Sequence, residues 1–268
     1  MFFRPKEMPE AYECRPYARL AWEGLRNEVG TALRARAPTP EQKFLIFAQG
    51  RTGSTLLTST LNRHPEIRCD DEILDRPKAF TRRYAENMAR AAPTRCYGFH
   101  VKIYQLTAWQ RVTDVGGFLR EMQDHGWKIL YLWRENALRH VVSNVFAEAS
   151  GAYHMPKDGG GGAPAKMPLP LDRLEKGIPN RLRLREEERA ALNGLDYLEL
   201  NYERDLQSPE SQPATFARIQ DYLGVTQHDL TPKLKKMVDK PLSDLIGNYD
   251  EVAGWVEAHP EFASYLSA

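Results

Sequence analysis

Apolar and polar residues follow two patterns that take turns along the chain. Short runs rich in large apolar residues indicate buried strands, and they cover residues 43–49, 97–106, 127–135 and 195–203. Each run is followed by a stretch whose apolar residues recur every three or four positions, as on one face of a helix. These helical stretches cover residues 54–62, 115–126, 136–150 and 213–224. The order of the patterns therefore predicts strands and helices in alternation.

This alternation predicts an α/β fold. We expect a single P-loop-like domain over residues 43–268, with a central, mostly parallel sheet flanked by helices on both faces. Residues 1–42 are expected to form an N-terminal helical extension packed on that core. Residues 154–180 contain four consecutive glycines and several prolines, so a flexible loop is predicted there, either a lid or a disordered linker.

Composition narrows the classes of partner. There are 37 lysines and arginines against 36 aspartates and glutamates, so the net charge is +1 and no global field recruits nucleic acid or a membrane. The aromatic residues are not interleaved with a basic stripe, which disfavours nucleic acid further. The three cysteines share no metal-ligand spacing, and no apolar run reaches the roughly 18 residues of a transmembrane segment. We expect a soluble, cytoplasmic protein with reduced thiols.

The turn between the first strand and its helix has the composition of a phosphate cradle. The sequence there is QGRTGST, residues 49–55. Gly50 and Gly53 permit positive φ, Arg51 adds a cation, and Ser54 and Thr55 add hydroxyl donors. In a parallel sheet such a turn presents backbone N–H groups at the start of a helix. The pattern predicts an anion site at the carboxyl end of the first strand.

Hydrolysis of ATP or GTP fits this turn poorly. A P-loop of that kind requires G-x-x-x-x-G-K-[ST] together with an aspartate that follows another strand. Here the two glycines are three positions apart, no lysine precedes Ser54, and none of the later predicted strands ends in a lone aspartate. A P-loop nucleotide kinase or other phosphotransferase and a non-catalytic nucleotide-binding module stay open as alternatives.

Three segments carry a resemblance to a known family. Residues 47–67, FAQGRTGSTLLTSTLNRHPEI, resemble the phosphosulfate-binding loop of sulfotransferases that use 3′-phosphoadenosine-5′-phosphosulfate (PAPS). Residues 131–145, YLWRENALRHVVSNV, are similar to the second signature of that family. Residues 241–256 resemble the C-terminal segment of its bacterial carbohydrate-type members. The resemblance implies transfer of a sulfuryl group from PAPS, without a metal, to an acceptor hydroxyl on a carbohydrate or glycolipid.

The resemblance also implies roles for individual residues in donor binding. The phosphosulfate would be held by Gly50, Arg51, Thr52, Gly53, Ser54 and Thr55. Arg51 would stabilise charge on the leaving oxygen, where many members use lysine. Arg134 and Ser143 would hold the 3′-phosphate, although they are nine positions apart and the usual spacing is eight, so Arg139 could share the role. Tyr202 and Glu203 match a pair that supports the loop from a neighbouring strand end.

The catalytic base has two candidates. Glu72 resembles the position at which glycan sulfotransferases carry a catalytic glutamate, and a partly buried carboxylate can accept a hydroxyl proton. His100 is the rival, because small-molecule sulfotransferases use a histidine that follows a central strand. Lys102 alternates onto the same side as His100 and is expected to touch the sulfuryl group or the acceptor. The sequence leaves the choice of base, the acceptor and the oligomeric state open.

Overall fold

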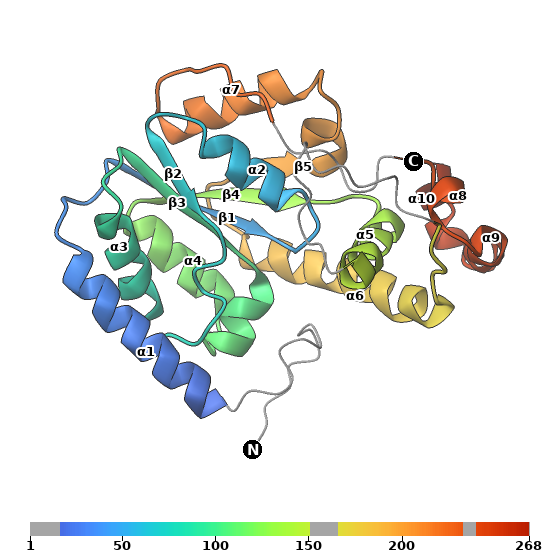
Figure 1. Cartoon of the computed structure of the whole chain (residues 1–268), viewed down its shortest axis with the longest axis horizontal. Coiled ribbons are helices and arrows are strands. Elements are labelled where there is room, and N and C mark those ends of the chain that lie inside the picture. Colours follow the sequence, from blue (N-terminus) through green and yellow to red (C-terminus); the bar gives the residue numbers. More distant parts are fainter. Residues whose placement is uncertain (1–16, 151–165, 233–239, 268) are drawn as a thin grey trace.

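The computed structural model describes residues 17–150, 166–232 and 240–267. A sheet with the strand order β2-β3-β1-β4-β5 crosses the centre of the molecule, and its four pairings are all parallel (Figure 1). The strands are β1 (Gln42–Ala48), β2 (Ile67–Asp70), β3 (Cys96–Val101), β4 (Trp127–Trp133) and β5 (Leu198–Asn201). The predicted α/β fold with a parallel central sheet is confirmed.

Helices surround this sheet on both faces (Figure 1). Those that follow or precede the strands are α1 (Tyr17–Arg34), α2 (Ser54–Leu61), α3 (Thr81–Ala91), α4 (Val115–Asp124), α5 (Ala137–Ser150), α6 (Leu171–Ala191) and α7 (Gln212–Leu223). The C-terminal part adds α8 (Leu242–Leu245), α9 (Tyr249–Glu257) and α10 (Ser264–Ser267). The short helices are η2 (Gln105–Trp109), η3 (Tyr202–Leu206) and η4 (Pro260–Phe262). In the described part of the chain, no helix is both long and apolar enough to span a bilayer.

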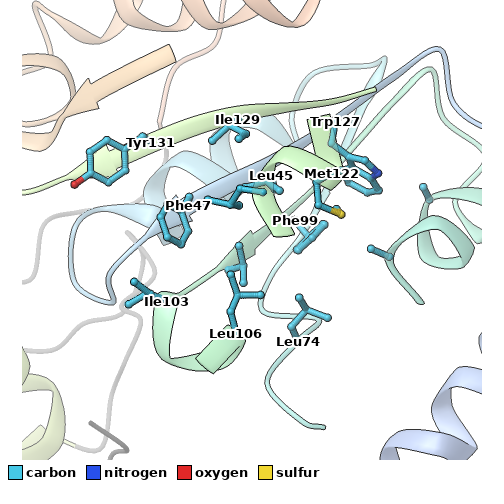
Figure 2. Close-up of a cluster of buried hydrophobic side chains, with 14 of the residues drawn as sticks. Leu45, Phe47, Leu74, Phe99, Ile103, Leu106, Met122, Trp127, Ile129 and Tyr131 are labelled. Atoms are coloured by element: carbon cyan, nitrogen blue, oxygen red, sulfur yellow. The ribbon is translucent and has the colours of Figure 1, made fainter. Parts of the chain in front are cut away.

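The sheet is buried on both sides because alternate residues of each strand point to opposite faces. Leu45 and Phe47 of β1 pack toward α3 and α4, in the cluster that Figure 2 shows with Phe99 and Ile129. Phe44 and the residues that alternate with it lie on the other face, against α2 and α7. A third apolar cluster joins α5 and the first half of α6 to α8 and α9. This third cluster fixes α5 beside the carboxyl end of the sheet.

The structure contains a strand and a helix that the apolar pattern did not predict. β2 has four residues, and of these Arg68 is exposed while Cys69 is buried, so it offers too short a pattern for recognition. α3 buries mainly Tyr84, Ala85 and Ala89 and is otherwise polar. The predicted strand over residues 97–106 is also too long, because β3 ends at Val101 and a π-helical turn follows from Gln105.

The prediction of irregular structure up to residue 180 is wrong for its last part. α6 begins at Leu171 and contains Pro179. Burial of Leu174 and Ile178 in the third apolar cluster stabilises the helix there in spite of the proline. Residues 151–165, which carry the four glycines, lie outside the described residues.

Gly98 gives a test of the packing between β1 and β3. It lies opposite Phe44 in the sheet, and a Cβ atom on Gly98 would be 2.2 Å from Cζ of that buried ring. We expect Gly98→Ala to lower the free energy of unfolding by about 1–3 kcal/mol, the usual cost of overpacking. Gly254→Ala in α9 is the control, because nothing lies within 4 Å of its added Cβ. Equal urea denaturation midpoints for the two variants would contradict the packing described here.

Candidate active site

The predicted phosphate cradle lies between the end of β1 and the start of α2. Arg51 has φ 70° and Gly53 has φ 91°, so the left-handed backbone expected at Gly50 is found at Arg51 instead. Left-handed backbone is uncommon for a residue other than glycine and often marks functional turns. A glycine is required at position 53 for a second reason: the Tyr202 ring packs so closely that a Cβ there would be 2.7 Å from it. The turn therefore has a specific shape that its sequence only partly predicted.

The start of α2 leaves backbone donors without an acceptor in the helix. The first bond of the α2 ladder runs from the amide of Leu57 to the carbonyl of Gly53, at 3.0 Å. The amides of Ser54, Thr55 and Leu56 precede it and have no acceptor within the helix. The Thr52 hydroxyl donates to the carbonyl of Gln49 at 2.7 Å, so it stabilises the turn itself. Thr52 can contribute to an anion site through its amide rather than through its side chain.

Arg134 and Ser143, the residues expected at the 3′-phosphate, lie beside the turn. Nη1 of Arg134 donates to the carbonyl of Arg51 at 3.3 Å, and Nε of Arg51 donates to Oγ of Ser143 at 3.3 Å. Nε of Arg134 also contacts Oε1 of Glu203 at 3.3 Å, and its guanidinium lies 4.8 Å from the ring centre of Tyr202. The Tyr202 and Glu203 pair thus supports both the turn and Arg134. Two arginines and a hydroxyl meet at one side of the cradle.

Arg139 makes a different contact from that of Arg134. Its Nη1 donates to the carbonyl of Lys240 at 3.2 Å, and its amide donates to Oδ1 of Asn136 at 2.8 Å. These bonds tie Arg139 to the segment that precedes α8. Of the two arginines considered for the same role, Arg134 is the one that bonds to the turn.

His140 supports the cradle and was missed in the sequence. Its Nε2 lies 2.6 Å from the carbonyl of Gly50, and the side chain is buried. Burial, reinforced by the nearby cations Arg181 and Arg134, lowers the pKa of His140 well below its usual value. The ring is therefore neutral, and Nε2 carries the hydrogen that it donates to Gly50. It lies on the side of α5 opposite Leu138 and Val142, so the apolar period of the helix gave no signal for it.

Glu72, His100 and Lys102 form a second cluster. Nζ of Lys102 lies 2.5 Å from Oε1 of Glu72, and Nε2 of Gln105 donates to the other carboxylate oxygen at 2.6 Å. Nδ1 of His100 is 3.8 Å from Oε1 of Glu72, and Nε2 of the same ring is 3.1 Å from the carbonyl of Ala48. The two rival bases are therefore neighbours. Gln105, which fixes the Glu72 carboxylate, had no signal in the sequence.

Accessibility separates the two candidate bases. The side chain of Glu72 is 29% exposed, whereas that of His100 is 1% exposed. Nδ1 of His100 has no hydrogen-bond partner among the described residues and faces the Glu72 and Asp71 carboxylates. A substrate hydroxyl can reach Glu72 from solvent, while it would have to displace neighbouring side chains to reach His100.

The same cluster contains the residues best suited to bind a cation. In the described part of the chain, ligand atoms of Asp71, Glu72 and His100 all lie within 4.8 Å of one another. Carboxylate oxygens and an imidazole nitrogen are ligands for several divalent metals. The Lys102 ammonium already lies against Glu72 and competes for that carboxylate.

The cradle and the second cluster adjoin at the carboxyl edge of β1 and β3. Nζ of Lys102 is 3.5 Å from the position that a Cβ on Gly50 would take, an ordinary contact distance, so the ammonium lies beside the turn. The bond from His100 to Ala48 joins the second cluster to the last residue of β1. An anion in the cradle and a group beside Glu72 would therefore be close neighbours.

A buried carboxyl group lies behind the cradle. Oε2 of Glu188 accepts hydrogen bonds from Nε2 of Gln49 at 3.3 Å and from the hydroxyl of Tyr131 at 3.4 Å. The other carboxyl oxygen has no partner in the described part of the chain. Burial raises the pKa of Glu188 from 4.5 to about 8. The folded protein therefore holds Glu188 mainly protonated at neutral pH.

This raised pKa predicts a pH dependence of stability. The free energy of unfolding should fall as pH rises from 4.5 to about 8, because the folded chain then binds a proton that the unfolded chain has lost. Each pKa unit corresponds to about 1.4 kcal/mol. We expect Glu188→Gln to match the wild type at pH 5 and to exceed its stability at pH 9. Urea unfolding of both proteins at pH 5, 7 and 9 checks this, and parallel pH profiles would contradict it.

Comparisons with known proteins find solved structures that are similar to this chain. No protein-family model and no curated protein matches this sequence. Among solved structures, that of mouse sulfotransferase SULT7A1 complexed with PAP is similar, with a TM-score of 0.43 and 14% sequence identity. The match covers 77% of this chain and 66% of that chain, so the protein spans just under two thirds of the mouse protein's length.

Proposed function

We propose that the protein is a PAPS-dependent sulfotransferase. One observation carries the proposal: an anion cradle, with Arg134 and Ser143 beside it, adjoins the partly exposed Glu72 carboxylate at one edge of the sheet. Sulfuryl transfer requires a held donor, stabilisation of charge on the leaving phosphate and a base for the acceptor hydroxyl. The two adjoining clusters supply groups for each of these needs.

The hydrogen-bond donors of the cradle and its neighbours suit a nucleotide with two separate anionic groups. The amides that begin α2, together with Arg51, would hold the phosphosulfate. Arg134 and Ser143, which bond to Arg51 at one side of the cradle, would hold the 3′-phosphate. When bound, PAPS supplies an activated sulfuryl group whose leaving phosphate needs no protonation. The product would be 3′-phosphoadenosine-5′-phosphate (PAP).

We assign the base role to Glu72 and a positioning role to His100. Glu72 would take the proton of the acceptor hydroxyl, since it is the more exposed of the two. Lys102 would leave Glu72 to stabilise negative charge near the transferred group, because its ammonium already lies beside Gly50. Gln105 would keep the carboxylate oriented during this exchange.

We further propose that the acceptor is a carbohydrate or glycolipid. The position of Glu72 and the resemblance of residues 241–256 to carbohydrate-type members support this class. Cys69 and Cys96 are buried free thiols, which suits a reducing compartment such as the cytoplasm.

The test is a screen of carbohydrate, glycolipid and small phenolic acceptors with sulfur-labelled PAPS in the presence of EDTA. Transfer of label to a sugar hydroxyl is the expected result. Magnesium-dependent turnover of ATP without sulfuryl transfer would favour a kinase instead. Binding of PAP with no transfer to any acceptor would favour a non-catalytic nucleotide-binding module.

A further inference from the structure

Helix α1 presents its large apolar residues to solvent. Trp22, Leu25, Val29 and Leu33 are 62%, 39%, 54% and 66% exposed, and their spacing of three or four residues places them in one stripe. The side that faces the protein is made instead of small and polar residues. These inward residues are Gly24, Glu28, Thr31 and Ala35.

The contacts of the inward side show that this orientation is specific. A Cβ on Gly24 would be 1.9 Å from the carbonyl of Pro77, so the helix approaches the protein too closely there for any other residue. Glu28 accepts a hydrogen bond from the amide of Ala79, and the Thr31 hydroxyl contacts Sδ of Met88 at 3.8 Å. A rotation of α1 that buried the apolar stripe would break all these contacts.

Phe80 is a further exposed apolar residue, in the segment that contacts α1. It is 62% exposed and directly follows Ala79, which is bonded to Glu28 of α1. Within the described residues, Phe80 and the four stripe residues are the large hydrophobic side chains that are exposed. We call these five residues the α1 patch. Contiguous apolar patches larger than a few hundred Å² are rare on soluble monomers and usually mark an interaction surface.

The charges around the α1 patch have one sign. Arg26, Arg34 and Arg36 are exposed along or just after α1, and Arg83 is exposed just after Phe80. The two acidic residues of the helix do not offset them, since Glu28 is buried and Glu23 is paired with Arg76. A helix with tryptophan and aliphatic residues on one side and arginines beside them is typical of helices that lie in a membrane interface.

We propose that the α1 patch binds the surface of an anionic phospholipid bilayer, with α1 in the plane of the interface. Charge complementarity favours this occupant over a second copy of the chain, because a symmetric dimer through this face would bring arginines against arginines. The patch is also small for a dimer: it has five large apolar residues, whereas a stable interface uses roughly 20–30 residues a side. The proposal rests on the α1 patch alone and is independent of the sulfotransferase assignment.

Vesicle flotation of the full chain tests this. We expect binding to vesicles of phosphatidylcholine with 30% phosphatidylglycerol to exceed binding to pure phosphatidylcholine at least tenfold, and 0.5 M NaCl to weaken it. Trp22→Gln with Leu33→Gln should lower binding at least tenfold. Arg26→Gln should lower vesicle binding less than this pair does, and it should reduce the salt dependence of binding. Asn27→Gln, on the polar side of the same helix, and Arg120→Gln, an exposed arginine of α4, should bind like the wild type.

Other outcomes would overturn the proposal. Equal binding to neutral and anionic vesicles would remove the charge argument. Failure to bind either vesicle, combined with a dimer in analytical ultracentrifugation that Trp22→Gln with Leu33→Gln dissociates, would assign the α1 patch to a second copy. If the protein is monomeric and binds neither kind of vesicle, the α1 patch does not bind membranes. Thermal unfolding of each variant guards against loss of binding through loss of the fold.

Discussion

Replacing Glu72 by glutamine is expected to lower the rate of sulfuryl transfer by about 10²–10⁴-fold, the usual contribution of a general base. Glutamine keeps the shape of the side chain and can still bond to Gln105, but it has no basic oxygen for the acceptor proton. Nucleotide affinity should barely change, because Glu72 is not among the groups that line the cradle. Single-turnover rates on an acceptor found by the screen, with PAP affinity measured in parallel, make the comparison.

Two neighbouring substitutions serve as controls for Glu72. Asp71→Asn makes the same charge change one residue earlier, where the side chain is exposed, and should cost little. His100→Asn should cost less than Glu72→Gln, because it disturbs packing and the bond to Ala48 rather than removing the proton acceptor. If His100→Asn abolishes transfer while Glu72→Gln stays near the wild type, the histidine is the base. The argument from Glu72 to a carbohydrate acceptor then weakens.

Arg134→Ala should weaken the binding of PAP by roughly 1.5–3 kcal/mol, the range for a hydrogen bond to a charged group. This corresponds to an increase in Kd of about one to two orders of magnitude. The reason is that Arg134, which lies just before α5, bonds to the cradle through the carbonyl of Arg51. Isothermal titration calorimetry of both proteins gives the difference directly.

Arg139→Ala is the matched control for Arg134→Ala. Arg139 has the same charge and lies five positions later, but its Nη1 bonds to Lys240. Its removal should cost less than that of Arg134. A larger loss of PAP affinity in Arg139→Ala would show that the nine-residue spacing between Arg134 and Ser143 misidentified the 3′-phosphate site. Because Arg134 also bonds to Glu203, unfolding of the variant must be measured before its affinity is interpreted.

Elements whose apolar residues recur with a clear period could be predicted from the sequence. Elements that depend on contacts with distant parts of the chain could not. β1, β4, α5 and α7 carry clear apolar patterns, and each appears within two residues of its predicted bounds. β2 is too short for a pattern, and α6 holds a proline that local rules place outside helices. Its helix is stabilised by apolar residues that pack against α5 and the C-terminal helices, which lie far from it in the sequence.

The same distinction explains which parts of the candidate site could be predicted from the sequence. The cradle could be found from its sequence because its donors are consecutive residues. Glu72 and His100 are rivals because they match the bases of two branches of the family, and nothing in the sequence predicts β2 or the pairing with β3 that makes them neighbours. That pairing sets Asp70 opposite Phe99, and so brings the residues after β2 beside His100. His140 and Gln105 act through contacts with residues from other elements, which a local pattern does not contain.

The most direct test of the central claim is calorimetry with PAP and with AMP, which lacks the 3′-phosphate, in buffer that contains EDTA. If the cradle with Arg134 and Ser143 forms a site for a 3′-phosphorylated nucleotide, PAP should bind without metal. AMP should then bind at least tenfold more weakly, since it loses charge-assisted hydrogen bonds to that group. Binding of AMP as tight as that of PAP would contradict the assignment, and with it the proposal that this protein uses PAPS.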